Sequence, residues 1–428
     1  MSLHKGLSLV LLLGAFGLFA GEYLILGKPD RATGIYAKGE EITFSILVTE
    51  DKKPVSGVKL VCELVYDGGS RSTKEFVTDG KPCEIRARRD DPGWVYVTGK
   101  LFDADGKEIK IKEGSSDGVG ALVSPEELRG GPEPADFDDF WKAQRAMLDK
   151  VPVKASREAV SSREGFDAYD VKVDCAGPKP VSGYLTIPKG AAPKSCPVVV
   201  SFHGAGVRSA GKAFRPGAIS FDVNAHGIAN GQVPAFYNEL ANGELRGYSH
   251  QHKTSREEFY FRNVYLRVMR ALDYVKTLPE WDGKRLIVVG GSQGGAQAIV
   301  AAALDHDVTL CVAGVPALSD HFGSMSTPPH RPGWPRLFIV QDGKPTPQQE
   351  AVARASAYYD NVFFAKRIQC DTYMSTGFND ASCSPVGVWI ACHNLPVKSR
   401  KGFTITPNGN HRTSRNTAGN AALDAALK

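Results

Sequence analysis

The sequence has almost no excess of one charge, and it lacks the motifs that define common cofactor and metal sites. Lys and Arg total 52 against 47 Asp and Glu, and the basic residues are scattered apart from short clusters such as residues 86–89. This distribution is not typical of nucleic-acid binding. There is no GxxxxGK[ST], no HExxH and no GxGxxG after a first strand, and His250-Gln251-His252 has no partner carboxylates at defined spacing. We therefore expect no cofactor, no metal and no nucleic-acid partner.

Cysteine is sparse for a chain of this length. There are 8 cysteines in 428 residues, and none forms a CxxC pair. An even number in an exported chain permits disulfides but does not require them. Buried free thiols and a Cys62–Cys83 bridge within the N-terminal region are both open alternatives.

A hydrophobic run long enough for a firm membrane anchor is also missing. The apolar stretch from Leu7 to Ala20 follows His4 and Lys5 and is interrupted only by Ser and Gly. It is short for a bilayer span of about 20 residues, and it is typical of a secretory signal peptide. We expect residues 1–20 to be removed, with secretion or periplasmic location and no stable membrane insertion. An uncleaved anchor that extends through residues 23–26 is the alternative.

The chain is too long for one ordinary core, so we expect two domains. Residues 21–123 contain short alternating runs rich in Val, Ile, Tyr and Phe, separated by Asp-Gly turns, which predict a small all-β sandwich. Residues 124–135 are rich in Pro and Gly and predict a linker. Residues 136–428 form the second domain, which begins with a docking helix whose apolar residues lie on one face.

From about residue 165 the pattern changes to strands that alternate with helices. Residues 166–175 and 181–188 predict an antiparallel pair, and later apolar runs predict buried strands with helices at 257–279, 292–304 and 348–368. Such a pattern calls for a mostly parallel sheet covered on both faces, an α/β fold. Reactive groups in such sheets lie beyond the carboxyl ends of the strands.

Ser292 is the predicted nucleophile of an α/β-hydrolase. It lies in Gly290-Gly291-Ser292-Gln293-Gly294, between an apolar strand at 285–289 and a helix at 293–304. A nucleophile turn needs small neighbours, because the chain reverses so sharply that larger side chains would collide with adjacent strands. The backbone N–H of Gln293, near the helix N-terminus, is a predicted oxyanion donor.

The orienting acid and the base should follow the serine in the chain, acid first. Asp380 follows the strand that ends at Gly377, and His411 follows the strand at 402–406, each in a loop at a strand's carboxyl end. These two residues complete the predicted catalytic triad. The other acids and histidines are less suitable. Asp360 is expected inside a helix, and Asp371 at the start of a strand. His306 lies just past a helix end, His393 on the short helix after Pro385, and His321 and His330 too early in the expected order.

A second oxyanion donor is expected in the loop after the strand at 196–202. Residues 203–206 supply it, with the backbone N–H of Ala205 as the candidate. His203 is better explained as a hydrogen-bonded residue beneath this loop.

Three stretches then resemble one family. Residues 259–304 are similar to the nucleophile region of the acetyl xylan esterase and cephalosporin C deacetylase group, carbohydrate esterase family seven. Residues 137–141 resemble its domain opening, and residues 358–385 its acid region. The resemblance implies an α/β-hydrolase that removes acetyl groups from acetylated sugars through Ser292, Asp380 and His411. It covers about 136–415 and leaves the N-terminal β region as an addition.

Three departures leave the acyl group and the sugar open. The chain has His226-Gly227-Ile228 where the family has Arg-Gly-Gln, Arg412 where it has Glu, and Ala205 where it usually has an aromatic residue. Ala205 should widen the pocket without removing the backbone donor. The alternatives are a peptidase or an esterase of bulkier acyl or uronic esters, and a non-catalytic glycan-binding protein. A homo-oligomer is compatible with all of them.

Overall fold

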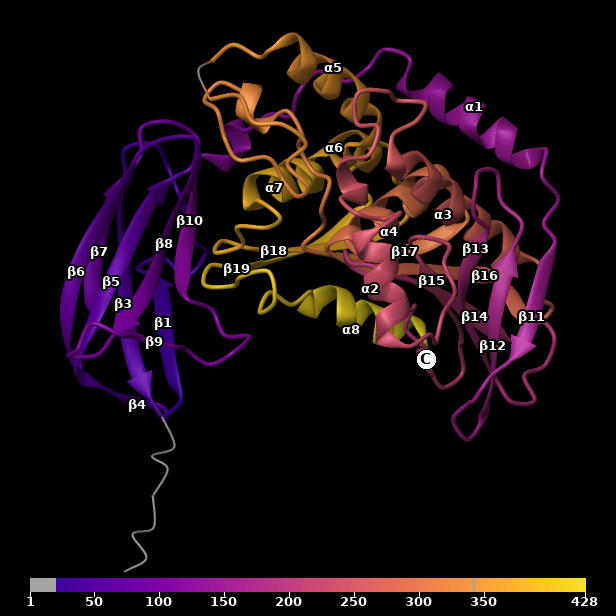
Figure 1. The fold of residues 1–428 in the computed structure, drawn as a ribbon, viewed down its shortest axis with the longest axis horizontal. Coiled ribbons are helices and arrows are strands. Elements are labelled where there is room, and N and C mark those ends of the chain that lie inside the picture. Colours follow the sequence, from indigo (N-terminus) through magenta and orange to yellow (C-terminus); the bar gives the residue numbers. More distant parts are fainter. Residues whose placement is uncertain (1–20, 342) are drawn as a thin grey trace, which may run out of the picture.

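The structure is a computed structural model that describes residues 21–341 and 343–428. The predicted signal peptide lies outside these residues. Figure 1 shows a β-rich N-terminal region beside a larger α/β region. In the ranges described, no helix combines the length and the apolar character needed to cross a membrane.

The N-terminal region consists of two packed sheets, which are antiparallel except for the parallel pairing of β2 with β10. In the first, β1 (Tyr23–Pro29) and β7 (Cys83–Arg88) both pair with β3 (Glu41–Glu50), and β4 (Lys53–Pro54) extends the sheet. The second has the order β2-β10-β8-β5-β6, with β9 beside β8. Its strands are β2 (Ile35–Tyr36), β5 (Ser56–Tyr66), β6 (Arg71–Asp79), β8 (Gly93–Phe102), β9 (Glu108–Ile109) and β10 (Gly118–Val123). Alternate apolar side chains from both sheets fill the space between them, which is the arrangement of a β-sandwich.

A nine-stranded sheet forms the centre of the α/β region, in the order β11-β12-β13-β15-β14-β16-β17-β18-β19. The strands from β11 to β15 pair antiparallel, and those from β15 to β19 pair parallel. The strands are β11 (Ala155–Ala159), β12 (Phe166–Val173), β13 (Val181–Pro188), β14 (Cys196–Phe202), β15 (Ile219–Asn224), β16 (Trp281–Gly291), β17 (Val308–Gly314), β18 (Asp371–Gly377) and β19 (Arg400–Thr406).

Helices cover both faces of this sheet because alternate strand residues point to opposite sides. Val199 and Ile287 belong to a small apolar cluster against which α8 packs, whereas Val198 and Val200 belong to the larger core on the other face. Figure 1 shows α8 on one side of the sheet and α3 and α4 on the other. The helices are α1 (Phe137–Asp149), α2 (Pro234–Asn242), α3 (Tyr260–Lys276), α4 (Gln293–Leu304), α5 (Pro347–Ser356), α6 (Asn361–Phe364), α7 (Pro385–Asn394) and α8 (Thr417–Ala426), with short 3₁₀ turns at Pro125–Glu127, Tyr248–His250, Gly323–Met325, Ala357–Tyr359 and Ala365–Arg367.

The prediction of one continuous helix at residues 348–368 is wrong. Residues 348–368 form α5, two 3₁₀ turns and α6 instead, and Asp360 lies between them rather than inside a helix. Its carboxylate accepts hydrogen bonds from the backbone N–H groups of Val362, Asp320 and His321. A side chain that caps a new helix start competes with continuation of the old helix.

The cysteines are unbridged. All eight lie within the described residues as free thiols, with Cys62 buried and Cys83 half-buried. The structure therefore has buried and half-buried thiols and no Cys62–Cys83 bridge. Burial raises the pKa of the Cys62 thiol to about 12, so this thiol is unreactive at neutral pH.

Candidate active site

Ser292 occupies a strained turn between β16 and α4. Its backbone has φ 58° and ψ −124°, a conformation that non-glycine residues seldom adopt. Tight backbone packing holds it there, since the Ser292 N–H donates to Gly314 and the Ser292 carbonyl accepts from Ala317. A Cβ on Gly290 would lie 2.1 Å from the Gly294 carbonyl oxygen, and one on Gly294 would lie 2.0 Å from that of Phe202. Gly290 and Gly294 are thus required by space, in agreement with the predicted need for small residues around the serine.

Alanine substitution should distinguish glycines whose Cβ position is crowded from glycines whose Cβ position is open. Gly294→Ala is expected to lower the free energy of unfolding by about 1–3 kcal/mol or more, because the new methyl group meets a backbone oxygen that cannot move aside. Gly291→Ala is the matched control, since the nearest atom to its Cβ is 3.9 Å away. Urea unfolding of both variants checks this. Equal stability losses would contradict the packing that the structure shows.

The structure brings the three predicted triad residues together. His411 Nε2 lies 3.0 Å from Ser292 Oγ, and His411 Nδ1 lies 2.8 Å from Asp380 Oδ2. A carboxylate only accepts, so Nδ1 carries the proton and Nε2 is free to accept from the serine hydroxyl. The other Asp380 oxygen accepts from the N–H groups of Ser382 and Cys383 at 2.8 and 2.9 Å. Asp380 is buried and His411 is partly exposed, so the chain of hydrogen bonds leads from the interior to an accessible serine.

Both predicted oxyanion donors border this serine. Gln293 is the first residue of α4, and a Cβ on Gly204 would lie 3.7 Å from Ser292 Cβ, which places the loop with Ala205 beside the nucleophile. Within the described ranges, neither the Ala205 nor the Gln293 N–H has a hydrogen-bond acceptor. Two free N–H groups beside a nucleophile, one of them at a helix N-terminus, can stabilise a developing oxyanion.

A buried network that the sequence did not predict joins the two oxyanion elements. Tyr248 donates its hydroxyl to Gln293 Oε1 at 2.6 Å and accepts from the Gly206 N–H at 3.3 Å. His226 Nε2 donates to the Gly206 carbonyl at 3.2 Å, and Nδ1 accepts from the Tyr260 hydroxyl at 2.6 Å. Burial lowers the pKa of His226 to about 3, so the ring stays neutral and keeps this pattern. His226, a departure from the family pattern, thus fixes Gly206, which follows Ala205.

His203 lies beneath the same loop, as expected. Its Nδ1 donates to the Gly204 carbonyl at 2.7 Å, and its Nε2 accepts from the Ala225 N–H at 3.1 Å. Burial lowers its pKa to about 4, so it is a neutral bridge between the ends of β14 and β15. Both ring nitrogens are occupied, which leaves none for proton transfer.

The N-terminal sandwich supports the loops that carry Asp380 and His411. The indole N–H of Trp94 donates to the Phe378 carbonyl at 2.7 Å, and the Gly120 N–H donates to the Pro407 carbonyl at 2.8 Å. Asn379 donates to Asp117 at 2.8 Å. These contacts place the sandwich directly behind the two loops.

The remaining histidines and acids lie elsewhere. His306 and His393 are exposed, His393 on α7 as expected, and Asp371 pairs with Lys401 on the surface. His330 and His321 are buried near Asp320, and His330 bonds to that carboxylate. For residues 21–341 and 343–428, no group of three or more His, Cys, Asp or Glu side chains has an arrangement that could hold a metal ion.

His321 should make stability depend on pH. Burial lowers its pKa to about 4, and neither ring nitrogen has a hydrogen-bond partner among the described residues. In this pH range the unfolded chain therefore binds a proton at His321 that the native state does not bind. The free energy of unfolding falls as the pH drops from about 6.5 to 4. His321→Leu should reduce this slope by up to about 1.4 kcal/mol per pH unit, measured by urea unfolding at pH 8, 6 and 5. Parallel curves for the two proteins would show that His321 is not a neutral buried group.

The fold and the comparisons with known proteins define the class of this protein. The chain is an α/β-hydrolase and a serine carboxylic ester hydrolase. A family profile described as acetyl xylan esterase matches residues 126–424. The chain therefore belongs to the acetyl xylan esterase family, as the resemblance in its sequence implied.

A curated relative extends the similarity beyond the hydrolase region. The chain is 32% identical over 421 residues to the acetyl esterase Axe7A of Xylanibacter ruminicola, covering 93% of this chain and 89% of the relative. That coverage includes most of the N-terminal β region, which the sequence resemblance had left outside. The N-terminal region is therefore shared with at least this relative.

Solved structures match about 71% of this chain. The acetyl xylan esterase from Paenibacillus sp. R4 has a TM-score of 0.56 and 26% identity, over 71% of this chain and 97% of that one. Acetyl xylan esterase 1 from Thermoanaerobacterium sp. JW/SL YS485 has a TM-score of 0.55 and 22% identity, over 71% and 96%, and shows the shared fold.

Proposed function

We propose that this protein is a secreted esterase that removes acetyl groups from acetylated oligosaccharides of the xylan type, with Ser292, His411 and Asp380 as its triad. The observation that supports it best is the unbroken chain of hydrogen bonds from Asp380 through His411 to Ser292. The names of the relatives and the apolar run at residues 7–20 support the substrate class and export.

In the first half-reaction Ser292 Oγ attacks the ester carbonyl while His411 Nε2 takes the hydroxyl proton. Asp380 holds the imidazole with Nδ1 protonated and stabilises the imidazolium that forms. The Gln293 and Ala205 N–H groups bind the oxyanion. When the intermediate collapses, His411 gives its proton to the leaving sugar alkoxide, and the acetyl group remains on Ser292.

In the second half-reaction water replaces the sugar. His411 removes a proton from the water, which attacks the acetyl-enzyme, and the same two N–H groups bind the second oxyanion. Collapse of this intermediate releases acetate and returns the proton to Ser292.

The test is product analysis with active-site labelling. The purified protein should release acetate from acetylated xylooligosaccharides, and a fluorophosphonate should modify Ser292, as identified by peptide mass spectrometry. Absence of labelling would refute the triad and favour a non-catalytic glycan-binding protein.

A bulkier acyl group is a second candidate, because Ala205 is small and exposed beside the nucleophile. Rates on acetate, on bulky acyl and uronic esters and on peptide amides separate the candidates. Faster turnover of bulky esters or amides than of acetate would replace the acetyl esterase proposal by an esterase or peptidase on the same fold.

A further inference from the structure

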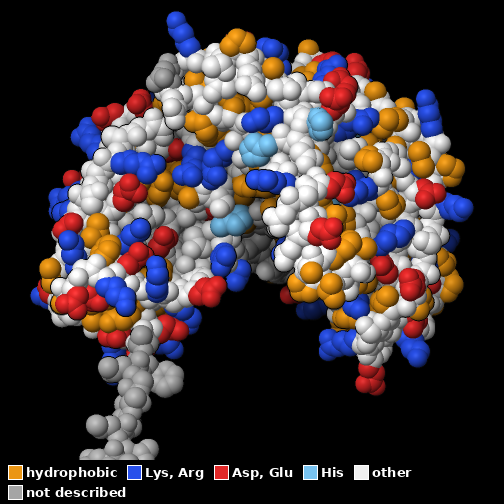
Figure 2. Space-filling view, viewed as in Figure 1, with side chains coloured by type: hydrophobic (Ala, Val, Ile, Leu, Met, Phe, Trp, Pro, Cys, Tyr) orange, Lys and Arg blue, Asp and Glu red, His pale blue; other side chains and the backbone are white. Residues whose placement is uncertain are grey.

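A pocket of about 520 Å³ lies between the sandwich and the hydrolase region. Its lining comes from strands β5, β6 and β8 on one side and from residues 324–341 on the other, and it includes none of the triad residues. Figure 2 shows Lys and Arg side chains gathered beside the hollow between the two regions. This volume lies in the range of sites for small ligands.

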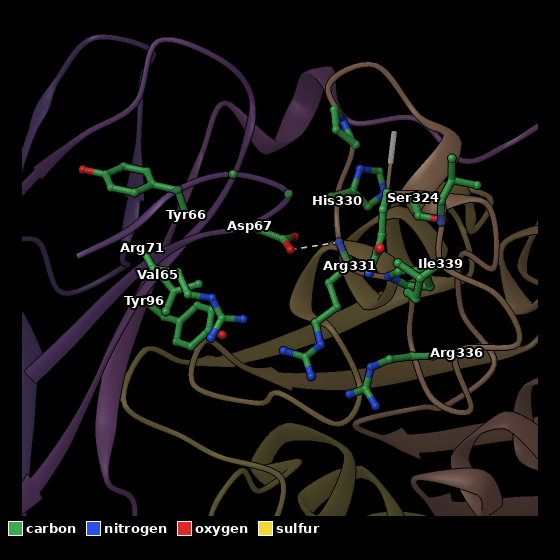
Figure 3. Close-up of a pocket in the computed structure, with 16 residues that line it drawn as sticks. Val65, Tyr66, Asp67, Arg71, Tyr96, Ser324, His330, Arg331, Arg336 and Ile339 are labelled. Carbon is green, nitrogen blue, oxygen red and sulfur yellow. Dashed lines mark hydrogen bonds between the residues drawn. The ribbon is translucent and has the colours of Figure 1, made fainter. Parts of the chain in front are cut away.

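Three arginines from both regions line this pocket. Arg71 belongs to β6, whereas Arg331 and Arg336 belong to the hydrolase loop. In Figure 3 the side chains of Arg331 and Arg336 extend toward the space beside Arg71 and Tyr96, and Tyr66 points away. The guanidinium groups therefore surround one site together with an aromatic ring.

Among the described residues, arginines outnumber acidic residues in the lining of this site. The acidic residue described there is Asp67, which is 4% exposed and accepts a hydrogen bond from the Arg331 backbone N–H at 2.9 Å. In the part of the chain that the structure describes, Arg71 forms an exposed ion pair with Glu63 at 3.3 Å. Burial and the positive charge of Arg331 lower the pKa of Arg336, whereas the charges of Cys383 and Asp380 raise it. An anion in the pocket would reduce the repulsion between Arg331 and Arg336 and could pair with the guanidinium groups of Arg71 and Arg331.

The two walls of the pocket pack directly against each other. The turn after β5 contacts the hydrolase loop so closely that a Cβ on Gly68 would lie 1.9 Å from the Pro329 carbonyl oxygen. Gly68 has φ +70°, a backbone conformation that glycine adopts readily and other residues rarely adopt. Because both walls are in direct backbone contact, binding requires little ordering of the protein.

The pocket adjoins the catalytic region through Arg336. Its guanidinium donates to the carbonyl groups of Ala381 and Ser382, and the Ser382 N–H bonds to Asp380. The pocket therefore lies beside the loop that carries Asp380.

We infer that the arginine pocket binds the carboxylate of an acidic sugar unit in an acetylated oligosaccharide whose ester is cleaved at Ser292. The planar guanidinium groups match the geometry of a carboxylate, and Tyr96 forms part of the pocket wall beside them. This inference rests on the proposed function and gives its substrate class: acetylated oligosaccharides that carry a uronate.

The experiment compares three substrates: a chromogenic acetate, an acetylated neutral xylooligosaccharide, and the same oligosaccharide with one glucuronate side group. In Arg71→Gln/Arg331→Gln, kcat/KM for the uronate substrate should fall about tenfold to a hundredfold, mainly through KM, because charge-assisted hydrogen bonds are lost. The other two substrates should change less than about twofold, since neither carries the anion. Arg86→Gln, on the other sheet of the sandwich, is the matched control and should behave as wild type.

Two outcomes would overturn the inference. One is equal wild-type kcat/KM for the neutral and uronate substrates, and the other is an equal loss on all three substrates in the double variant, which indicates a structural role. Either result, with acetate still released by wild type, leaves the proposed function intact. Failure of wild type to release acetate from any of the three would refute the proposed function itself.

Discussion

Replacement of Ser292 by alanine is expected to lower kcat for acetate release by about 10⁴-fold to 10⁶-fold, with little change in stability. The hydroxyl is the group that His411 accepts from at 3.0 Å, and nothing adjacent in the triad can replace it as nucleophile. The alanine keeps the Cβ that the strained turn already accommodates. Initial rates on a chromogenic acetate and urea unfolding of the same preparation check both parts.

The other two triad residues provide the companion test. Asp380→Asn should lower kcat by about 10⁴-fold, because an amide that faces His411 Nδ1 permits the wrong tautomer. His411→Ala should have an effect of the same order, since the serine then loses its base. Triad residues act as a unit, so a Ser292→Ala/His411→Ala double variant should be about as slow as the slower single one. Substantial activity in all the single variants would place the reaction elsewhere in the protein.

The candidate triad could be predicted from the sequence, because local pattern and chain order indicate its residues. Gly290 and Gly294 surround a serine between a strand and a helix. This pattern can be recognised from the local sequence alone. Asp380 and His411 each follow an apolar strand, and parallel strands bring their carboxyl ends to one edge of the sheet. The order serine, acid, histidine then selects these two residues from the other candidates.

The support around the triad was not predictable in the same way. His226, Tyr248 and Tyr260 meet through contacts across the fold, and none of them has a local pattern that predicts a partner. Strand β11 was missed because every residue in it is exposed, so it has no apolar alternation. The sequence pattern predicts a helix through Asp360, because the Asp320 and His321 N–H groups whose hydrogen bonds its carboxylate accepts belong to a distant segment.

The arginine pocket has the same origin. Arg71 is far in the chain from Arg331 and Arg336, and it becomes their neighbour only when the sandwich packs on the hydrolase region. In the sequence they are scattered positive charges in an almost neutral composition. The overall composition thus argues against nucleic-acid binding, but it does not reveal this local cluster of positive charge.

The second large effect is expected at Trp94, on the sandwich side of the active site. Trp94→Ala should lower the free energy of unfolding by about 3–5 kcal/mol, because the indole is 0% exposed and its removal leaves a large cavity. Its ring also stacks on Tyr96 at a centroid distance of 4.1 Å, so the loss reaches the wall of the arginine pocket. The urea midpoint of the variant measures this loss.

Trp94→Phe separates packing from the hydrogen bond. It keeps most of the apolar volume and leaves the buried Phe378 carbonyl without the indole donor, at a cost of about 1–3 kcal/mol. Because Phe378 lies two residues before Asp380, the loosened loop should also lower kcat for acetate release. The sandwich would then be a positioning element for the triad as well as a source of stability.

Trp141→Phe is the matched control for this claim. Trp141 is 3% exposed, and its indole N–H donates to the Tyr358 carbonyl at 2.9 Å, so it loses the same kind of bond away from the triad loops. Both variants should lose similar stability, measured by urea unfolding, while only Trp94→Phe should lower kcat under conditions where each protein is fully folded. An unchanged kcat in Trp94→Phe, or an equal fall in Trp141→Phe, would mean that the sandwich stabilises the fold without positioning Asp380.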